Sequence, residues 1–260
     1  MRLLPIIVSA LLLTGCTAAA PEPDPAPSFE ELPEPADAAR TPAVACADEA
    51  LAGSSTWTSA DGAWFETGII GEGTTVAVFV PQSGESYCGF VDFASVLAEA
   101  GIQSVLINLC GVGATECGLE DNVLTSGANA VLAAAEQARA DGATRVVAVG
   151  ASMGGTTVIL ASALSKDDGP LDAVADLSGP IEFAGVDTQP LAGDIAIPML
   201  LAVSGADAVV NAAELDQLGS ASSSPNWVRY SGTGHGWAML SSREVAVTDL
   251  ALTLVDFIAG

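Results

Sequence analysis

Short runs rich in aliphatic and β-branched residues recur along this 260-residue chain, and most are followed by Gly, Ser, Asp or Pro. Such runs are typical of strands that are buried on both faces of a parallel sheet. We expect strands at residues 75–80, 104–109, 145–149, 173–177, 195–203 and 227–230. Two more, at residues 56–58 and 64–70, flank Asp61-Gly62, a dipeptide that favours a hairpin turn.

Between these runs, apolar residues recur every three or four positions, which is the spacing of amphipathic helices. We expect helices at residues 90–100, 126–140, 156–164, 211–218 and 245–258. Strands that alternate with helices predict the α/β class: a doubly wound, mostly parallel sheet with helices on both faces and an antiparallel start. In such a sheet the loops beyond the carboxyl ends of the strands share one edge, where reactive groups gather.

The strand that ends at Val149 runs directly into Gly150-Ala151-Ser152-Met153-Gly154. A Gly-x-Ser-x-Gly order between a strand and a helix predicts a sharp turn with a strained, exposed serine, and the glycines let strand and helix approach closely. The alternative is a glycine-rich turn with an incidental serine. Because of the strand and helix on either side, we interpret Ser152 as a nucleophile.

A serine hydroxyl needs a base to take its proton, and imidazole is the usual one because its pKa lies near neutrality. His235 is the only histidine in the chain, and it follows the last predicted strand in a glycine-rich loop. The imidazole needs a carboxylate that fixes its tautomer. Asp207, after the strand at 195–203, is the first choice and Asp176 the second. A packed histidine and a turn-forming aspartate are the structural alternatives.

With Ser152, Asp207 and His235 in that chain order, the sequence resembles the α/β-hydrolase family over roughly residues 50–260. The resemblance rests on the Gly-x-Ser-x-Gly turn, on the Asp-x-x-Val segment that begins at Asp207, and on the glycines that flank His235. It implies acyl transfer, in which Ser152 attacks a carbonyl, His235 moves the proton and water releases the acyl group. The N–H of Met153 would be one oxyanion donor.

The loop after the strand at 75–80 departs from that family. Where the family often has His-Gly, this chain has Pro81-Gln82. Proline has no N–H, so the second oxyanion donor has to come from Gln82 or Ser83. Loss of one such donor typically raises the barrier by about 2.7–4 kcal/mol.

The function predicted from these residues is a serine hydrolase, similar to carboxylesterases, with a small-molecule ester as substrate. Only residues 178–194 separate two sheet strands, which leaves no room for a large lid domain and favours short or soluble acyl groups. Two alternatives stay open: a catalytically idle binding lipoprotein of the same fold, and a peptidase or thioesterase that uses the same triad. Tyr87, Phe183 and Trp237 could line the pocket, although packing is the simpler role for each.

The amino terminus predicts export. Residues 1–15 have the form of a signal peptide, with Arg2 before an apolar run that is too short to span a bilayer. The run ends in Leu-Thr-Gly-Cys, which resembles a bacterial lipobox and predicts lipidation of Cys16, with an ordinary signal peptide as the alternative. Residues 16–45 form a Pro-rich acidic linker and residues 46–260 the catalytic domain. We therefore expect a protein anchored by lipid on the extracytoplasmic face of a bacterial membrane.

The composition of the chain limits the kinds of partner and cofactor that we expect. With 7 basic and 32 acidic residues the net charge is −25, which disfavours nucleic acid as a partner. No cofactor is expected, and a single histidine without a Cys-x-x-Cys pair argues against a metal site. Four cysteines remain besides Cys16. An even number in an exported chain favours two disulfides over free thiols. Three pairings are possible, and we favour Cys46 with Cys88 and Cys110 with Cys117.

Overall fold

A computed structural model of the chain describes residues 46, 55–60, 63–117, 122–165, 169–241 and 247–260. The predicted signal peptide, Cys16 and the linker lie outside these described residues. No helix formed by the described residues is long and apolar enough to cross a membrane.

The centre of the fold is an eight-stranded sheet with the order β1-β2-β4-β3-β5-β6-β9-β10. Only β2 runs antiparallel to its neighbours, and the remaining pairs are parallel. The strands are β1 (Ser55–Ala60), β2 (Ala63–Ile70), β3 (Thr75–Val80), β4 (Gln103–Ile107), β5 (Arg145–Ala151), β6 (Ala173–Leu177), β9 (Met199–Ser204) and β10 (Trp227–Gly232). The doubly wound, mostly parallel sheet and its hairpin start were predicted correctly.

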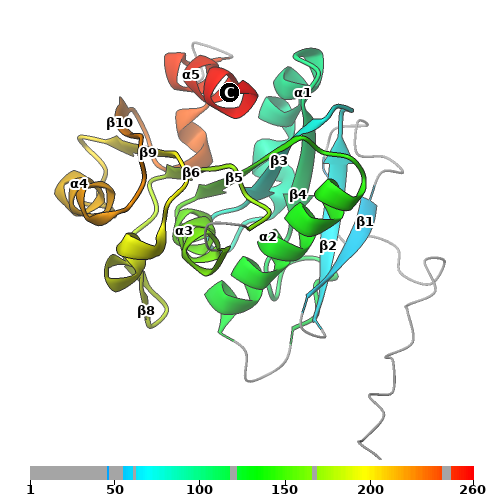
Figure 1. The fold of residues 1–260 in the computed structure, drawn as a ribbon, viewed down its shortest axis with the longest axis horizontal. Helices are drawn as coiled ribbons and strands as arrows, with labels where there is room; N and C mark the ends of the chain where they lie inside the picture. Colours follow the sequence, from blue (N-terminus) through cyan, green and yellow to red (C-terminus); the bar gives the residue numbers. More distant parts are fainter. Residues whose placement is uncertain (1–45, 47–54, 61–62, 118–121, 166–168, 242–246) are drawn as a thin grey trace, which may run out of the picture. The chain divides into compact units, whose positions relative to one another are not determined.

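Helices cover both faces of this sheet (Figure 1). One face packs against α2 (Val123–Ala140), α3 (Met153–Ser165) and α4 (Ala212–Ala221). The other packs against α1 (Val91–Glu99), α5 (Asp249–Ala259) and the short 3-10 helices η2 (Tyr87–Phe90) and η4 (Gly236–Met239).

Strand β3 is apolar at every position after Thr75. Val76, Val78 and Val80 face the core under α2 and α3, while Ala77 and Phe79 face the core under α1 and α5. Because successive side chains point to opposite faces, a strand covered on both sides needs apolar residues throughout.

Two elements begin four residues later than predicted, and the other starts differ by three residues or fewer. Strand β9 begins at Met199 instead of residue 195, because residues 189–194 form the 3-10 helix η3 (Gln189–Asp194) and Pro198 lacks the N–H that an inner strand needs. Helix α5 begins at Asp249 instead of residue 245, because the Thr248 side chain caps it by accepting from Ala251 N.

The segment between β6 and β9 holds no large lid domain, as predicted. It contains a hairpin of two short strands, β7 (Glu182–Phe183) and β8 (Val186–Asp187), followed by η3. The hairpin was not predicted, because strands of two residues carry no periodic signal. The Asn122 side chain, which caps α2, also donates from Nδ2 to Ala184 O at 2.9 Å and joins this hairpin to α2.

Two disulfides have the favoured pairing. Cys46 is bonded to Cys88, which ties the start of the domain to η2. Cys110 is bonded to Cys117, which closes the loop after β4. The Asp61-Gly62 turn of the hairpin lies outside the described residues.

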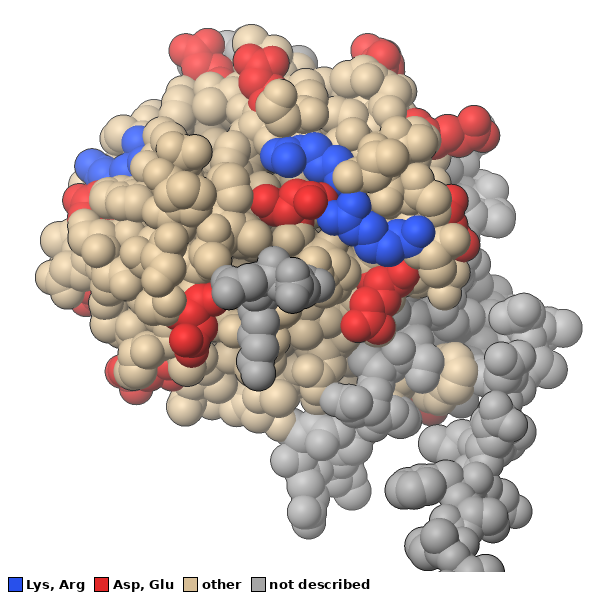
Figure 2. Space-filling view, in the orientation of Figure 1, with Lys and Arg blue, Asp and Glu red and all other residues tan. Residues whose placement is uncertain are grey.

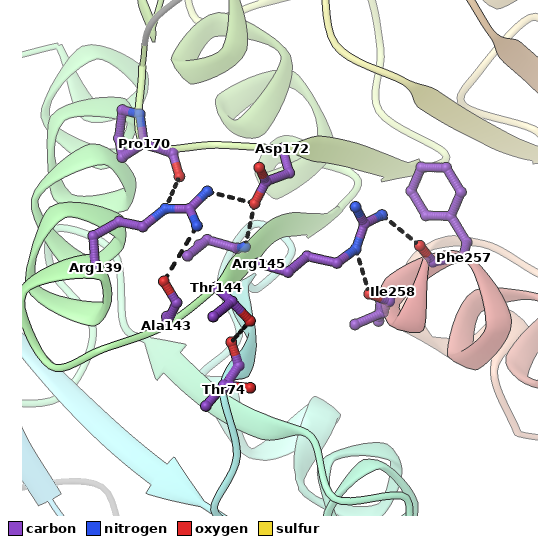
Figure 3. A network of polar contacts seen from close by, with 10 residues as sticks. Thr74, Arg139, Ala143, Thr144, Arg145, Pro170, Asp172, Phe257 and Ile258 are labelled. Carbon is purple, nitrogen blue, oxygen red and sulfur yellow. Dashed lines mark hydrogen bonds and ion pairs between the residues drawn. The ribbon is translucent and has the colours of Figure 1, made fainter.

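The few arginines of the described residues serve as structural links (Figure 3). Arg145, at the start of β5, donates from Nε to Ile258 O at 2.8 Å and from Nη2 to Phe257 O at 3.0 Å, so that it satisfies the last carbonyls of α5. Arg139 pairs with Asp172, whose carboxylate also accepts from Val146 N at 2.6 Å. On the face shown in Figure 2, basic side chains are few and lie next to acidic ones.

We expect Arg145→Met to lower the free energy of unfolding by about 2 kcal/mol, because two charge-assisted hydrogen bonds to helix-end carbonyls are lost. Urea denaturation measures the change. The control is Arg229→Met, which removes a partly exposed ion pair with Asp216 at 3.0 Å and should cost less than about 1 kcal/mol. Equal losses in the two variants would contradict the capping role of Arg145.

Candidate active site

Ser152 lies at the sharp turn between β5 and α3. Its φ of 50° is a left-handed conformation, which non-glycine residues adopt at some energetic cost. The turn is held by Ser152 N, which donates to Leu177 O of the neighbouring strand at 2.9 Å. A Cβ at Gly150 would collide with the Gly154 carbonyl, and one at Gly154 would collide with the Val80 carbonyl. The predicted strand–turn–helix is therefore present, with both glycines required by contact.

Asp207 and His235 form a hydrogen-bonded pair. His235 Nδ1 lies 2.8 Å from Asp207 Oδ2, and the carboxylate side chain is fully covered, whereas 29% of the imidazole is exposed. The other carboxylate oxygen accepts from Val209 N at 2.8 Å and from Val210 N at 3.1 Å. Burial alone would raise the pKa of Asp207, but the hydrogen bonds from His235, Val209, Val210 and Ser178 outweigh it and the pKa falls below its ordinary value.

The loop that carries His235 lies against the turn that carries Ser152. Gly236 has a φ of 58°, and a Cβ placed there would lie 3.5 Å from Ala151 Cβ and would collide with Gln82 Oε1. The loops after β3, β5 and β10 thus meet at Gly236. The structure gives a hydrogen bond between Asp207 and His235. A contact between His235 and the Ser152 hydroxyl is part of the proposed function.

Of the predicted oxyanion donors, Gln82 reaches the same point, because its Oε1 lies next to Gly236. Met153 is the first residue of α3, so its N–H belongs to the helix-start amides that lack an intrahelical partner. Gln82 and Ser83 lie in a turn closed by Glu85 N, which donates to Gln82 O at 3.2 Å. Gln82 Nε2 donates to Glu85 Oε1 at 3.4 Å, and Gln82 Oε1 is buried without a hydrogen-bond partner among the described residues.

A buried polar network fixes the end of this loop. Tyr87 N donates to Asn108 Oδ1 at 2.8 Å, and Tyr87 OH donates to Glu66 Oε1 at 3.2 Å. Ala114, inside the loop closed by the Cys110–Cys117 disulfide, donates from N to Glu66 Oε2 at 2.7 Å. Tyr87, considered above as a pocket residue, is 1% exposed and has a structural role instead.

Asp176, the second choice for the catalytic acid, lies elsewhere. Its side chain is under the first turn of α3, where it accepts from Gly179 N at 2.6 Å and where a Cβ on Gly155 would collide with it. Burial raises the pKa of Asp176 to about 7, and the Gly179 hydrogen bond offsets only part of this rise. The partner of His235 is Asp207.

Ser178 is the site residue that sequence reasoning missed. It follows β6 directly, has a φ of 61°, is fully buried, and its side chain is one of the groups that lower the pKa of Asp207. A Ser-Gly pair directly after a predicted strand was visible in the sequence, but nothing there indicated which neighbour the serine faces. Within the described residues, no group of three or more His, Cys, Asp or Glu side chains is placed to hold a metal ion.

Comparison with known proteins identifies the architecture. No protein-family model matches the sequence, and no curated protein matches it. Among solved structures, an esterase from Pyrococcus furiosus has a TM-score of 0.65 at 12% identity, covering 79% of this chain and 91% of its own. The chain has the α/β-hydrolase fold.

Two further structures extend this likeness. An esterase from Exiguobacterium antarcticum aligns with a TM-score of 0.65 and 13% identity over 79% of this chain and 99% of its own. An enol-lactonase from Burkholderia xenovorans aligns with a TM-score of 0.65 and 14% identity over 79% of this chain and all of its own, 100%. At identities this low, the structural likeness establishes the α/β-hydrolase fold. The chemistry has to be inferred from the side chains of this chain.

The raised pKa of Asp176 predicts that Asp176→Asn stabilises the protein at high pH. The folded protein holds this proton more tightly than the unfolded chain does. The contribution of the carboxyl to stability is therefore full below its ordinary pKa of 3.8 and is lost as the pH rises through about 7. Relative to pH 4, the variant should gain up to about 4 kcal/mol over wild type at pH 8.

Thermal and urea unfolding at both pH values measure this gain. The matched control is Asp194→Asn, because Asp194 is exposed at the end of η3. The control should show no such pH-dependent gain. A stabilisation of Asp176→Asn that is the same at pH 4 and pH 8 would contradict the proposed burial penalty.

Proposed function

We propose that this protein is a serine hydrolase that cleaves ester-type acyl bonds, with Ser152 as nucleophile, His235 as general base and Asp207 as the acid that orients the base. The observation that carries the proposal is the 2.8 Å hydrogen bond between Asp207 and His235, formed by a loop that packs against the strained Ser152 turn. A histidine kept in place only for packing would not need a buried carboxylate that two backbone N–H groups also hold.

The reaction follows from this geometry. His235 takes the proton of the Ser152 hydroxyl as its oxygen attacks the substrate carbonyl, and Asp207, held ionised by its hydrogen bonds, stabilises the imidazolium that forms. The tetrahedral oxyanion is stabilised by Met153 N–H at the start of α3 and by an N–H of Gln82 or Ser83. His235 then gives its proton to the leaving alcohol, and water attacks the acyl-enzyme by the same route.

Structural neighbours named as esterases and an enol-lactonase support hydrolysis of an oxygen ester. A peptidase or thioesterase would use the same three side chains, and a binding protein would leave them idle. The complete donor set on Asp207 favours the catalytic alternatives, because burying a carboxylate costs free energy that only its full set of hydrogen bonds offsets.

The proposal includes attachment to the extracytoplasmic face of a bacterial membrane by lipid on Cys16. It is supported by the sequence alone, through the Arg2-led apolar run and the Leu-Thr-Gly-Cys segment. One acyl chain binds membranes only weakly, and stable attachment needs more than one.

The anchor is tested by fractionating bacterial cells that express the full chain. Wild type should collect in the membrane fraction and incorporate labelled fatty acid. Cys16→Ser should lose the label and leave the membrane, whereas the linker control Ser28→Ala should behave as wild type. Fatty-acid label that persists in Cys16→Ser would contradict lipidation at this residue.

The triad is tested with a fluorophosphonate probe and 4-nitrophenyl butyrate. Wild type should be labelled and should hydrolyse the ester, because the probe reacts with activated serines. Ser152→Ala and His235→Ala should abolish labelling and lower kcat by at least about 10⁴-fold, and Asp207→Asn should lower kcat by about 10³- to 10⁴-fold.

Matched controls are Ser162→Ala, which removes another buried hydroxyl of α3, hydrogen-bonded to Val158 O at 2.8 Å, and Asp194→Asn. Both should keep labelling and kcat. Wild-type protein that is folded yet neither labelled nor active on esters, thioesters or peptides would favour the idle binding protein and overturn the proposal.

A further inference from the structure

The Glu85 carboxylate is connected to the centre of the candidate site through a single side chain. Glu85 Oε1 accepts a hydrogen bond from Gln82 Nε2 at 3.4 Å. The other end of the same carboxamide, Gln82 Oε1, is the atom with which a Cβ on Gly236 would collide. Because Gly236 follows His235 directly, only the Gln82 carboxamide separates the Glu85 carboxylate from the loop that carries the proposed base.

The turn after β3 fixes the place of Glu85. Glu85 N donates to Gln82 O at 3.2 Å and closes the turn. Gly84, the third residue of this turn, has a φ of 75°, a value that type II turns require at that position and that glycine adopts without strain. Ser83, Gly84 and Glu85 are exposed. The carboxylate therefore faces solvent at the edge of the sheet where the candidate site lies.

No basic side chain of the described residues pairs with Glu85, and the described loops at this edge contain none. Arg139 and Arg145 lie at the amino ends of the strands, where they bind main-chain carbonyls (Figure 3). Arg229, in β10, is paired with Asp216 at 3.0 Å. The charge of Glu85 is thus not neutralised by a neighbouring cation of the described part of the chain.

The neighbouring loops add charge of the same sign. In the sheet, β4 lies beside β3 and β6 lies beside β5, so the loops after β4 and β6 flank the two loops that hold Gln82 and Ser152. Glu116 and Glu182, one in each flanking loop, are exposed. A cleft bordered by one sign of charge concentrates ions of the opposite sign and repels ions of its own sign. This effect is carried by exposed groups and is screened by salt.

We propose that Glu85 is a specificity-determining residue, and that the preferred substrates of the site are short esters that carry an ammonium group, whereas esters that carry an anionic group are poor substrates. Glu85 acts on the charge of the arriving ester and does not touch the reacting atoms. This inference rests on the proposed function, because it concerns which ester reaches Ser152 and not the chemistry of Ser152 itself.

Three 4-nitrophenyl esters of similar shape separate charge from size. The acyl groups are 4-(trimethylammonio)butyrate, which is cationic, 5,5-dimethylhexanoate, its neutral carbon analogue, and 4-sulfobutyrate, which is anionic. Each kcat/KM is divided by the rate constant of alkaline hydrolysis of the same ester, which removes differences in intrinsic reactivity. The measured quantity is the ratio of the cationic to the anionic value, in wild type and in variants of the full chain.

The variants change the charge at position 85 and keep the turn. Glu85→Gln retains a side-chain oxygen that can accept from Gln82, and Glu85→Lys reverses the charge. The matched control is Asp141→Asn, because the exposed Asp141 also accepts from a glutamine, Gln137 Nε2 at 3.0 Å, but lies at the end of α2, next to the start of β5 and away from the site.

One unit charge near the site should change kcat/KM about 3-fold for each charged ester, in opposite directions. The cationic-to-anionic ratio should therefore fall about 10-fold in Glu85→Gln and about 100-fold in Glu85→Lys, and should stay at the wild-type value in Asp141→Asn. The neutral ester should keep its kcat within about 2-fold in Glu85→Gln. In about 1 M NaCl, where charges are screened within about 3 Å, the wild-type ratio should approach that of Glu85→Gln.

Two kinds of failure are distinguishable. Wild type that hydrolyses the esters with a ratio unaffected by Glu85→Gln, by Glu85→Lys and by salt would overturn the specificity role and leave the hydrolase intact. An equal loss on all three esters in Glu85→Gln would also overturn it, because that result shows a structural role of the turn. Folded wild type that hydrolyses none of the esters would overturn the proposed hydrolase together with this inference.

Discussion

The close approach of β5 and α3 is the constraint on which the candidate site depends. Gly150 faces the Gly154 carbonyl, and Gly154 faces the carbonyl of Val80, at distances that admit no side chain. This packing forces the chain to reverse within one residue, and Ser152 takes up the reversal with its left-handed backbone. The same reversal starts α3 at Met153, whose helix-start N–H lacks an intrahelical partner and is an oxyanion donor in the proposed mechanism.

The described arginines around the sheet are not evenly distributed between the two ends of the strands. Arg139 and Arg145 link loops and helix ends around the amino ends of the strands (Figure 3). The described loops at the carboxyl ends of the strands are residues 81–86, 108–117, 178–194, 205–211 and 233–241. None of them contains Lys or Arg. A developing oxyanion therefore depends on neutral N–H donors, which must be held firmly in order to be effective. The hydrogen bonds among Tyr87, Asn108 and Glu66 hold the loop after β3 in place.

The sequence was sufficient to predict what depends on chain order alone. Strands buried on both faces are apolar throughout, and residues that follow parallel strands reach one edge, so Ser152, Asp207 and His235 could be proposed as neighbours before any contact was known. Contacts between loops were not predictable. Nothing in the pattern shows that Gly236 packs against Gln82 and Ala151. The start of β9 depends on Pro198 and a short 3-10 helix, which have no periodicity to detect.

The two buried aspartates show how environment assigns their roles. Asp207 accepts hydrogen bonds from two backbone N–H groups and from His235, and its pKa falls. Asp176 accepts the Gly179 N–H and is otherwise held by burial, and its pKa rises to about 7. A carboxyl that is half protonated at neutral pH is a poor stabiliser of an imidazolium, whereas one that stays ionised is a good one. Both aspartates lie close to strand ends, so their position in the chain could only rank Asp207 ahead of Asp176, and the donors around each carboxylate separate them.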